Sequence, residues 1–388
     1  MSVRKRTWKN RDGSQGESWI VNYTDQGGTR RMKSFEKKRD ADAFHATVNV
    51  DVRRGLHVPD SESITVAEAG DLWLESSALL ERTTRVQYRQ HANLHIVPLL
   101  GAVKLSQLTV PMVRAFEDKL AKTRSPVMVR KVLTSLGSIL ADAQERGLVA
   151  QNVVRGLRLQ RRGRGAEQRQ KPTLEVGVNI PTPMEVRAII TALEADTRWR
   201  PLLLTAILTG LRASELRGLR WSDIDLKRGE LRVRQRADRY GKLGPPKSKA
   251  GLRTVPLPPL LVNVLRTWKL ACPKGDLDLA FPSSRGGVEK LSNIIEDGLI
   301  PVGVAAGVIT KTGKAKYSGL HALRHFHASW CINRKEDGGL ELPLKLVSAR
   351  LGHASIQITA DRYGHLFPSA DDGAELAAAE QALLRPIS

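Results

Sequence analysis

Cysteine and long apolar segments are both scarce in this sequence. The two cysteines, Cys272 and Cys331, are too few for a disulfide framework and lack the spacing of a zinc site, which fits a reduced intracellular environment. No apolar run reaches the roughly 18 residues of a transmembrane helix, and the Arg- and Lys-rich N-terminal segment lacks the apolar core of a signal peptide. We therefore expect a cytoplasmic protein without a membrane partner.

Acidic residues are under-represented as well. The chain has 62 lysines and arginines against 40 aspartates and glutamates, so its net charge is +22 and its isoelectric point is near 10.3. This excess predicts a polyanionic partner, with nucleic acid favoured over a membrane surface. The hydrophobic content of 41% is sufficient for packed cores, and the length of 388 residues predicts two or three domains.

Residues 1–57 predict a small module made of a β-hairpin and a helix. Trp19–Tyr23 reads as a strand, Thr29–Phe35 as the return strand, and Lys37–Arg54 as a helix. The clustered positive charge favours phosphate contacts over a merely solvated basic face. We predict a DNA-binding module whose candidate contacts are Arg30, Arg31 and Lys33.

Residues 61–154 predict a four-helix DNA-binding domain. Thr65 and Glu68 form a capping box at the start of its first helix, and apolar residues recur at helical spacing from Ser125 to Arg146. Acidic and basic residues nearly balance here, so any DNA contact must come from local patches. The candidate contacts are Lys119, Lys122, Arg124, Arg130 and Lys131.

Residues 155–180 predict a basic linker between domains. Arginines and glycines dominate its first part, which is typical of a flexible segment that can cross DNA. A charge run that is merely solvated explains the same composition almost equally well. The candidate DNA contacts in this segment are Arg161 and Arg162.

Residues 181–388 predict a mostly helical domain with a small antiparallel sheet. Glu230–Arg236 and Leu252–Leu257 read as strands, and an Ala-rich helix is expected at 373–384. These strands are too few for a doubly wound fold. The whole chain is therefore predicted to be a multidomain α+β protein.

Tyrosine is also rare, with five residues in the chain, and Tyr363 stands ten residues after His353. A phenol has a pKa of about 10 and attacks poorly at neutral pH, so chemistry at Tyr363 requires nearby cations, acids and bases. A core tyrosine with a satisfied hydroxyl is the ordinary alternative.

Two arginines could hold a phosphate for such a tyrosine. Arg212 follows a glycine turn at the start of a helix, and Arg324 shares a helix face with His321 because their spacing is i,i+3. A guanidinium presents a charged planar fork that suits a phosphodiester, and a histidine can exchange a proton with a reacting oxygen. For Arg212, an i,i+3 ion pair with Glu215 is the alternative.

Lys247 lies on an expected loop and could protonate a leaving oxygen, with Lys249 and Arg253 as competitors. A basic hairpin tip that contacts only backbone is the alternative for this loop. His325 and His327 raise the possibility of a metal site, which we disfavour because no acidic residue accompanies a suitable histidine pair.

Taken together, these residues resemble the tyrosine recombinases of the phage integrase family. The matching words stand in family order: Thr-Gly-Leu-Arg-Ala-Ser-Glu-Leu (209–216), Pro-Lys-Ser-Lys (246–249), His-Ala-Leu-Arg-His (321–325), Leu-Gly-His (351–353) and Asp-Arg-Tyr-Gly-His (361–365). The resemblance covers the third domain and extends to residues 61–154 as a core-site-binding domain and to residues 1–57 as an arm-site-binding module. Ala322 departs from a family pattern that often has an acidic residue there.

The resemblance implies that Tyr363 attacks a DNA phosphate and forms a 3′-phosphotyrosyl bond. Arg212 and Arg324 would stabilise the charge on this phosphate. The remaining implied roles are a hydrogen bond to the phosphate from His353, general acid catalysis by Lys247 and proton transfer assisted by His321. Because the phosphotyrosyl bond stores the energy of the broken linkage, neither ATP nor a metal nor another cofactor is implied.

The implied function is site-specific recombination that integrates or excises a phage or another mobile element. The implied partners are double-stranded DNA with core and arm attachment sites, three further copies of the chain in a homotetramer on DNA, and an accessory DNA-bending protein. The implied location is the nucleoid in the cytoplasm. Glu375–Leu384 would dock on a neighbouring protomer or on its own domain. Type IB topoisomerase activity is disfavoured by the N-terminal basic module, and a DNA-binding regulator is disfavoured because every required side chain is present.

Overall fold

The computed structural model describes residues 2–25, 27–53, 57–155 and 174–367, together with residues 377, 380, 381, 383 and 384. They belong to two compact units, Met1–Gly165 and Ala166–Ser388. Arg161 and Arg162 lie outside the described residues, as do most of the predicted linker and most of the predicted C-terminal helix. Within the described residues, no helix combines the length and hydrophobicity needed to span a membrane.

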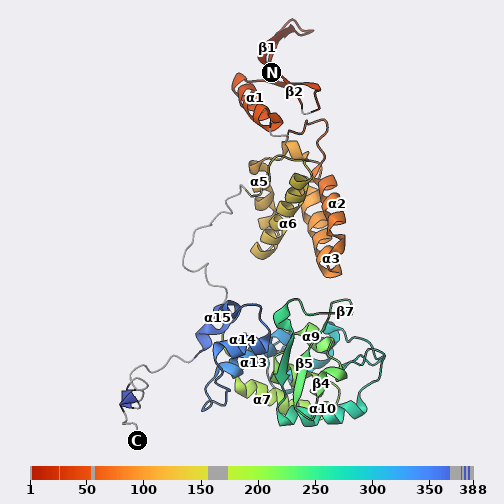
Figure 1. The fold of residues 1–388 in the computed structure, drawn as a ribbon, viewed down its shortest axis with the longest axis vertical. Helices are drawn as coiled ribbons and strands as arrows, with labels where there is room; N and C mark the ends of the chain where they lie inside the picture. The colour runs from red at the N-terminus through yellow and green to blue at the C-terminus, as the bar shows by residue number, and fades with distance from the viewer. Residues whose placement is uncertain are drawn as a thin grey trace. The chain divides into compact units, whose positions relative to one another are not determined.

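The first unit begins with a three-stranded antiparallel sheet that has β2 at its centre (Figure 1). Its strands are β1 (Ser2–Lys9), β2 (Gln15–Thr24) and β3 (Arg30–Phe35). The helix α1 (Lys38–Arg53) packs on one face through Phe44, which contacts the rings of Tyr23 and Phe35. The predicted hairpin and helix are confirmed. The sequence does not predict β1, because its mostly charged residues lack the alternation of a half-buried strand.

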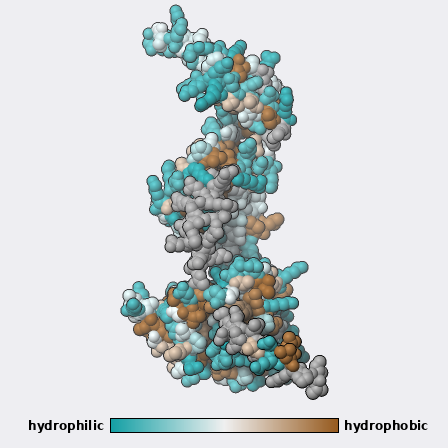
Figure 2. Space-filling model, turned by 90° about the vertical axis from the view of Figure 1, so that its left-hand side faces the viewer, coloured by the Kyte–Doolittle hydropathy of each residue, from teal (hydrophilic) through white to brown (hydrophobic). Residues whose placement is uncertain are grey.

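The strand register divides the basic side chains of this sheet between its two faces. Arg31 and Lys33 pair with residues of β2 that lie on the face covered by α1. Arg4, Arg6 and Arg30 pair with residues of the opposite face, which we call the open face, and all three are exposed. Figure 2 shows the largely hydrophilic surface of this module at the top of the view.

The rest of the first unit is the predicted bundle of four main helices. They are α2 (Val66–Ser76), α3 (Arg82–His91), α5 (Val110–Ala121) and α6 (Pro126–Glu145), with a π-helical turn at Ala92–Ile96 and the short α4 (Val97–Leu100) after α3. Thr65 and Glu68 exchange hydrogen bonds at the start of α2, so the predicted capping box is confirmed. The apolar stripe of α6, which includes Leu136 and Ile139, packs in the core with Phe116.

The second unit is mostly helical. Its helices are α7 (Pro183–Ala192), α8 (Arg200–Thr209), α9 (Ala213–Arg217), α10 (Pro259–Ala271), α11 (Leu291–Asn293), α12 (Ile300–Ala305), α13 (Leu320–Ile332), α14 (Leu344–Leu351) and α15 (Ile356–Tyr363). Its strands are β4 (Ile224–Asp225), β5 (Glu230–Val233) and β8 (Arg253–Pro256) in one antiparallel sheet, and β6 (Arg236–Ala237) with β7 (Leu243–Gly244) in a two-stranded ribbon. The predicted α+β class is confirmed.

The prediction of one continuous strand over Glu230–Arg236 is wrong, because Arg234 and Gln235 separate β5 from β6. At the break, Arg234 bonds to the Asp223 carboxylate, and the Gln235 amide donates to the carbonyl of Gly218. These side-chain contacts turn the chain out of the first sheet and into the ribbon that leads to the Lys247 loop.

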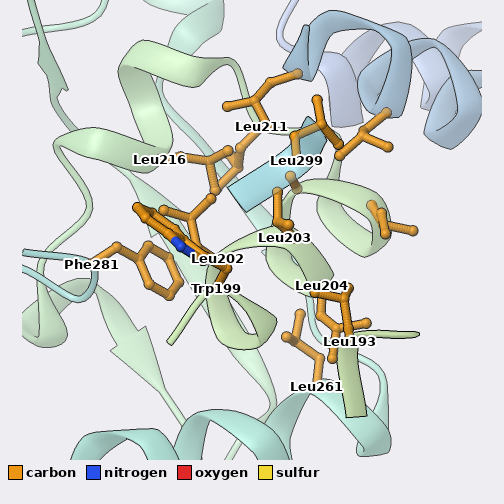
Figure 3. Close-up of a cluster of buried hydrophobic side chains, with 14 of the residues drawn as sticks. Leu193, Trp199, Leu202, Leu203, Leu204, Leu211, Leu216, Leu261, Phe281 and Leu299 are labelled. Atoms are coloured by element: carbon orange, nitrogen blue, oxygen red, sulfur yellow. The ribbon is translucent and has the colours of Figure 1, made fainter. Parts of the chain in front are cut away.

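The core of the second unit surrounds α8. Leu203, Leu204 and Ile207 of this helix are fully buried, and Figure 3 shows the leucines among Leu193, Leu261 and neighbouring apolar side chains. α8 contacts α13 and α10 on its two sides. This packing fixes where α8 ends and where the site residues after it begin.

Replacing Leu204 with alanine should lower the free energy of unfolding of the second unit by about 2 to 5 kcal/mol, because a buried leucine leaves a cavity that the core only partly fills. The matched control is Leu260→Ala on α10, since Leu260 is 46% exposed, and its effect should stay within about 0.5 kcal/mol. Urea unfolding measures both variants. Equal losses in the two would show that the core is not centred on α8.

Candidate active site

Arg324 connects two turns of the second unit that are far apart in sequence. Its side chain, on α13, is 2% exposed. Its Nη1 donates to the carbonyl of Gly210 at 2.6 Å, and its Nη2 donates to the carbonyl of Leu351 at 2.6 Å. Burial and the nearby Arg212 lower the pKa of Arg324 to about 9, which still leaves the guanidinium charged at neutral pH.

Both turns depend on glycine. Gly210 caps α8 with a φ of 61°, and Gly352 caps α14 with a φ of 64°, a left-handed conformation that other residues adopt at a cost. A Cβ on Gly210 would lie 2.6 Å from a ring atom of His327, and a Cβ on Gly352 would lie 2.7 Å from Nη1 of Arg253. These glycines therefore bring the chain close enough for Arg324 to bind both turns.

Arg212 is the N-cap residue of α9 and follows Gly210 by two positions. Its Nη2 donates to the carbonyl of Gly352 at 3.0 Å, and its Nη1 pairs with Glu215 at 2.8 Å. The ion pair considered from the i,i+3 spacing is thus present, and it orients Arg212 toward the second turn. The side chain keeps 36% exposure, so it remains open to a ligand.

Glu215 is a buried carboxylate between two arginines. It is 3% exposed and also binds Nη2 of Arg253 at 2.8 Å. Burial alone would raise the pKa of Glu215, but the bonds and charges of Arg253 and Arg212 hold it below its ordinary value. Arg253 also donates from Nε to the carbonyl of Arg350 at 2.7 Å. Arg253 is therefore committed to this ion pair, which disfavours it as a general acid.

Lys247 and Lys249 are exposed and lie between β7 and β8. Among the described contacts, neither lysine is bonded to the residues around Arg324. The structure therefore does not bring the predicted general acid Lys247 into the cluster, and it does not separate the two lysines as candidates.

His321 and His353 flank Arg324 in sequence, and Arg212 precedes both histidines. Partial desolvation and the charges of Arg324, Arg362 and Arg212 lower the pKa of His321. Burial and the same arginines lower the pKa of His353 to about 4. The His353 ring is therefore neutral at pH 7, and its Nδ1 lies 2.8 Å from the Thr359 hydroxyl. A neutral ring still has one N–H that can donate to a phosphate oxygen.

Tyr363 is the last residue of α15 and is 1% exposed. Its hydroxyl lies 2.7 Å from Nδ1 of His325, and the His353 ring is parallel to its ring at a centroid distance of 6.4 Å. Burial raises the pKa of Tyr363, although the charges of Arg324, Arg362 and Arg212 act to lower it. The structure thus brings Tyr363, His321, His353, Arg212 and Arg324 into one region, with the tyrosine covered.

His325 is the residue of this region that the sequence suggested only as a metal ligand. His321 and His325 lie one turn apart on α13, with ring centroids 4.7 Å apart. The i,i+4 spacing could have placed His325 beside His321, but only the fold places Tyr363 against it. Among the described residues, no group of three or more His, Cys, Asp or Glu side chains could hold a metal ion.

The candidate DNA contacts of the first unit fall into two groups. Arg31 and Lys33 lie on the helix-covered face and pair with acidic residues: Arg31 with Asp25 and Glu62, and Lys33 with Asp60. Arg30 lies on the open face and is exposed. Five further candidates are exposed around the end of α5 and the start of α6, namely Lys119, Lys122, Arg124, Arg130 and Lys131.

Comparisons with known proteins give consistent matches. Residues 181–369 match the family model described as the phage integrase family. The chain is 28% identical over 374 residues to the tyrosine recombinase XerC-like protein of Caldanaerobacter subterraneus, covering 89% of this chain and 90% of the relative. It is 28% identical over 279 residues to the integrase of Mycobacterium phage L5, covering 68% of this chain and 71% of the relative.

Solved structures match the fold. The Tn1549 transposon integrase in complex with transposon right end DNA aligns with a TM-score of 0.64 at 16% identity, covering 82% of this chain and 100% of that chain. A lambda integrase tetramer bound to a Holliday junction aligns with a TM-score of 0.55 at 18% identity, covering 90% of this chain and 95% of that chain.

The buried histidines predict a pH-dependent stability. Burial lowers the pKa of both His325 and His327 from the ordinary 6.5 to about 3. Below pH 6.5, these histidines therefore bind protons in the unfolded chain and remain neutral in the folded chain. The stabilisation is complete above the unfolded pKa and declines as the pH falls. From pH 6.5 to 5.5, the free energy of unfolding should drop by about 1 kcal/mol for each histidine.

This effect is measured by urea unfolding at each pH, with hydrogen exchange of the α8 amides as the probe of the second unit. Between pH 7.5 and 8.5, where these rings are neutral in both states, the histidines should contribute no change. Equal unfolding midpoints at pH 6.5 and 5.5 would contradict the neutral, buried state of the two rings.

Proposed function

We propose that this chain is a member of the phage integrase family, whose model matches residues 181–369, and that Tyr363 is the nucleophile with which it performs site-specific recombination of DNA. The observation that carries the proposal is the pair Arg212 and Arg324, whose charges act on the Tyr363 phenol. These guanidiniums bind backbone carbonyls of two facing turns, Arg324 those of Gly210 and Leu351 and Arg212 that of Gly352. Donors fixed in this way can stabilise the charge that develops on a phosphate in the transition state.

The proposed step is a transesterification at a DNA phosphate. The Tyr363 oxygen forms a bond to phosphorus as the bond to the 5′ oxygen breaks, which leaves a 3′-phosphotyrosyl linkage and a 5′ hydroxyl. The phenol gives its proton to His321, and the leaving oxygen gains one from the Lys247 ammonium. His353 donates a hydrogen bond to a phosphate oxygen. Religation to another strand reverses the same step, so the linkage energy is conserved.

Lys247 suits the role of general acid by its place in the chain. It lies on an exposed loop that is joined to the site through β8, where Arg253 pairs with Glu215. An ammonium that is not engaged by a described acidic partner is free to approach DNA when DNA arrives. Lys249 remains the competitor, since it is exposed on the same loop.

The proposed substrate is double-stranded DNA of a phage or another mobile element, and the proposed assembly on it is a homotetramer. The lambda integrase structure with a matching fold is a tetramer bound to a Holliday junction, which supports this arrangement. We further propose an accessory DNA-bending protein and a location on the nucleoid in the cytoplasm. A net charge of +22 favours such a polyanionic setting.

Within this function, we assign arm-site binding to residues 1–57 and core-site binding to residues 61–154. Residues 181–388 carry out the strand transfer, and the basic linker 155–180 joins them to the core-site domain. The open face of the N-terminal sheet supports the first assignment, since Arg4, Arg6 and Arg30 on it are exposed. Arg30 remains a proposed contact there. Arg31 and Lys33 are engaged in ion pairs and stabilise the module instead.

Tyr363→Phe should abolish covalent protein–DNA adducts on a nicked core-site substrate, because it removes the attacking oxygen and keeps the ring. DNA binding should remain within about twofold of wild type, since the ring is buried and contributes no charge to phosphate contacts. Denaturing gels detect the adduct, and a mobility shift measures binding. An adduct that persists in this variant would exclude Tyr363 as the nucleophile.

The double variant Arg4→Ala, Arg30→Ala should weaken binding of the full chain to a short duplex and reduce the slope of log affinity against log salt by about 2, one for each lost phosphate contact. Arg39→Ala is the matched control, because Arg39 lies on α1 with its side chain 87% exposed. Unchanged slope in the double variant, or an equal decrease in the control, would contradict DNA binding by the open face.

A further inference from the structure

The Tyr363 hydroxyl is bonded to a histidine that has no part in the proposed step. Nδ1 of His325 lies 2.7 Å from this hydroxyl, and the two side chains are 7% and 1% exposed. The ring centroids are 5.7 Å apart and the ring planes are tilted by 60°. The contact is therefore a hydrogen bond to the imidazole nitrogen and not a parallel stack of the two rings.

Both groups are neutral at pH 7, so the tautomer of the imidazole sets the direction of this bond. Burial, with His321 and Arg362 nearby, lowers the pKa of His325 to about 3, so its ring is neutral at pH 7. Burial raises the pKa of Tyr363, so the phenol keeps its proton. A neutral ring with its proton on Nε2 accepts at Nδ1. In that tautomer the hydroxyl donates to His325, its one hydrogen-bond partner among the described residues.

The remainder of the tyrosine sits in an apolar pocket between three helices. Its ring belongs to a buried cluster with Cys331 of α13 and with Val347 and Leu351 of α14. In this position the hydroxyl faces a protein group and is shielded from solvent, so a DNA phosphate cannot reach it. Attack requires α15 or its last residue to move, and the hydrogen bond to His325 is the polar contact that this movement must break.

We propose that His325 is a positioning residue that retains Tyr363 in its buried position through the hydrogen bond between the hydroxyl and Nδ1. His325 thereby sets the fraction of molecules in which the nucleophile is released before DNA is bound. The functional meaning of this retention rests on the proposed role of Tyr363, whereas the retention itself is a property of the DNA-free chain.

A double-mutant cycle in the DNA-free, full-length protein tests the coupling. Amide hydrogen exchange of Ser355–Phe367 is measured in the wild type, His325→Leu, Tyr363→Phe and the double variant. One buried hydrogen bond corresponds to about fivefold in an opening equilibrium, so each single variant should exchange about fivefold faster. The double variant should exchange no faster than the faster single variant, because the same bond is lost in all three.

His325→Asn is the conservative variant, since its amide oxygen can accept a hydrogen bond near the position of Nδ1. Its exchange should stay within about twofold of the wild type. Amides of α8 serve as the internal reference, because a general loss of stability would accelerate them as well.

Two results would overturn the proposal: effects of the single variants that multiply in the double variant, or unchanged exchange of Ser355–Phe367 in Tyr363→Phe. Unchanged exchange in Tyr363→Phe would overturn the proposal even if His325→Leu does not fold, because Tyr363→Phe removes only the hydroxyl oxygen. Neither readout needs DNA or covalent chemistry. Failure of this proposal is therefore distinguishable from failure of Tyr363 as the nucleophile.

Discussion

The catalytic unit depends on one buried cation. Arg324 is 2% exposed and binds the carbonyls of Gly210 and Leu351, which end α8 and α14. An unpaired buried charge is costly, so these two carbonyls, with the nearby Glu215, are what make its burial possible. The consequence is geometric: the turn that carries Arg212 and the turn that carries His353 are held against the same guanidinium. Both glycines adopt left-handed conformations that allow this approach.

The cations are in place while Tyr363, the proposed nucleophile, is buried. Arg212 and Arg324 already occupy defined positions through backbone carbonyls and Glu215, so DNA binding need not organise them. Burial, together with nearby positive charges, lowers the pKa of His321, His325 and His353. Tyr363, in contrast, is covered and bonded to His325. Under the proposed mechanism, this division assigns the conformational step to α15 and leaves the proposed phosphate-binding groups fixed.

The sequence predicts features that depend on near neighbours and misses those that depend on distant pairing. Spacing and capping residues locate α2, α6 and α8, and the ordered motif words identify five of the clustered residues. Strand β1 is missed because its pairing with β2 compensates for a charged sequence that lacks alternation. Arg31 and Lys33 were indistinguishable from Arg30 until the register assigned their face and their acidic partners. His325 acquires a role only because the fold brings Tyr363 to it, 38 positions later in the chain.

The most direct test of the central claim is to map the covalent bond itself. Full-length protein is trapped on a nicked core-site duplex, digested with protease and nuclease, and sequenced by mass spectrometry. We predict a nucleotide joined through its 3′ phosphate to Tyr363, with a free 5′ hydroxyl on the released strand and no label on the other four of the five tyrosines. A bond to another residue, or attachment through a 5′ phosphate, would contradict the claim that Arg212 and Arg324 hold the phosphate for Tyr363.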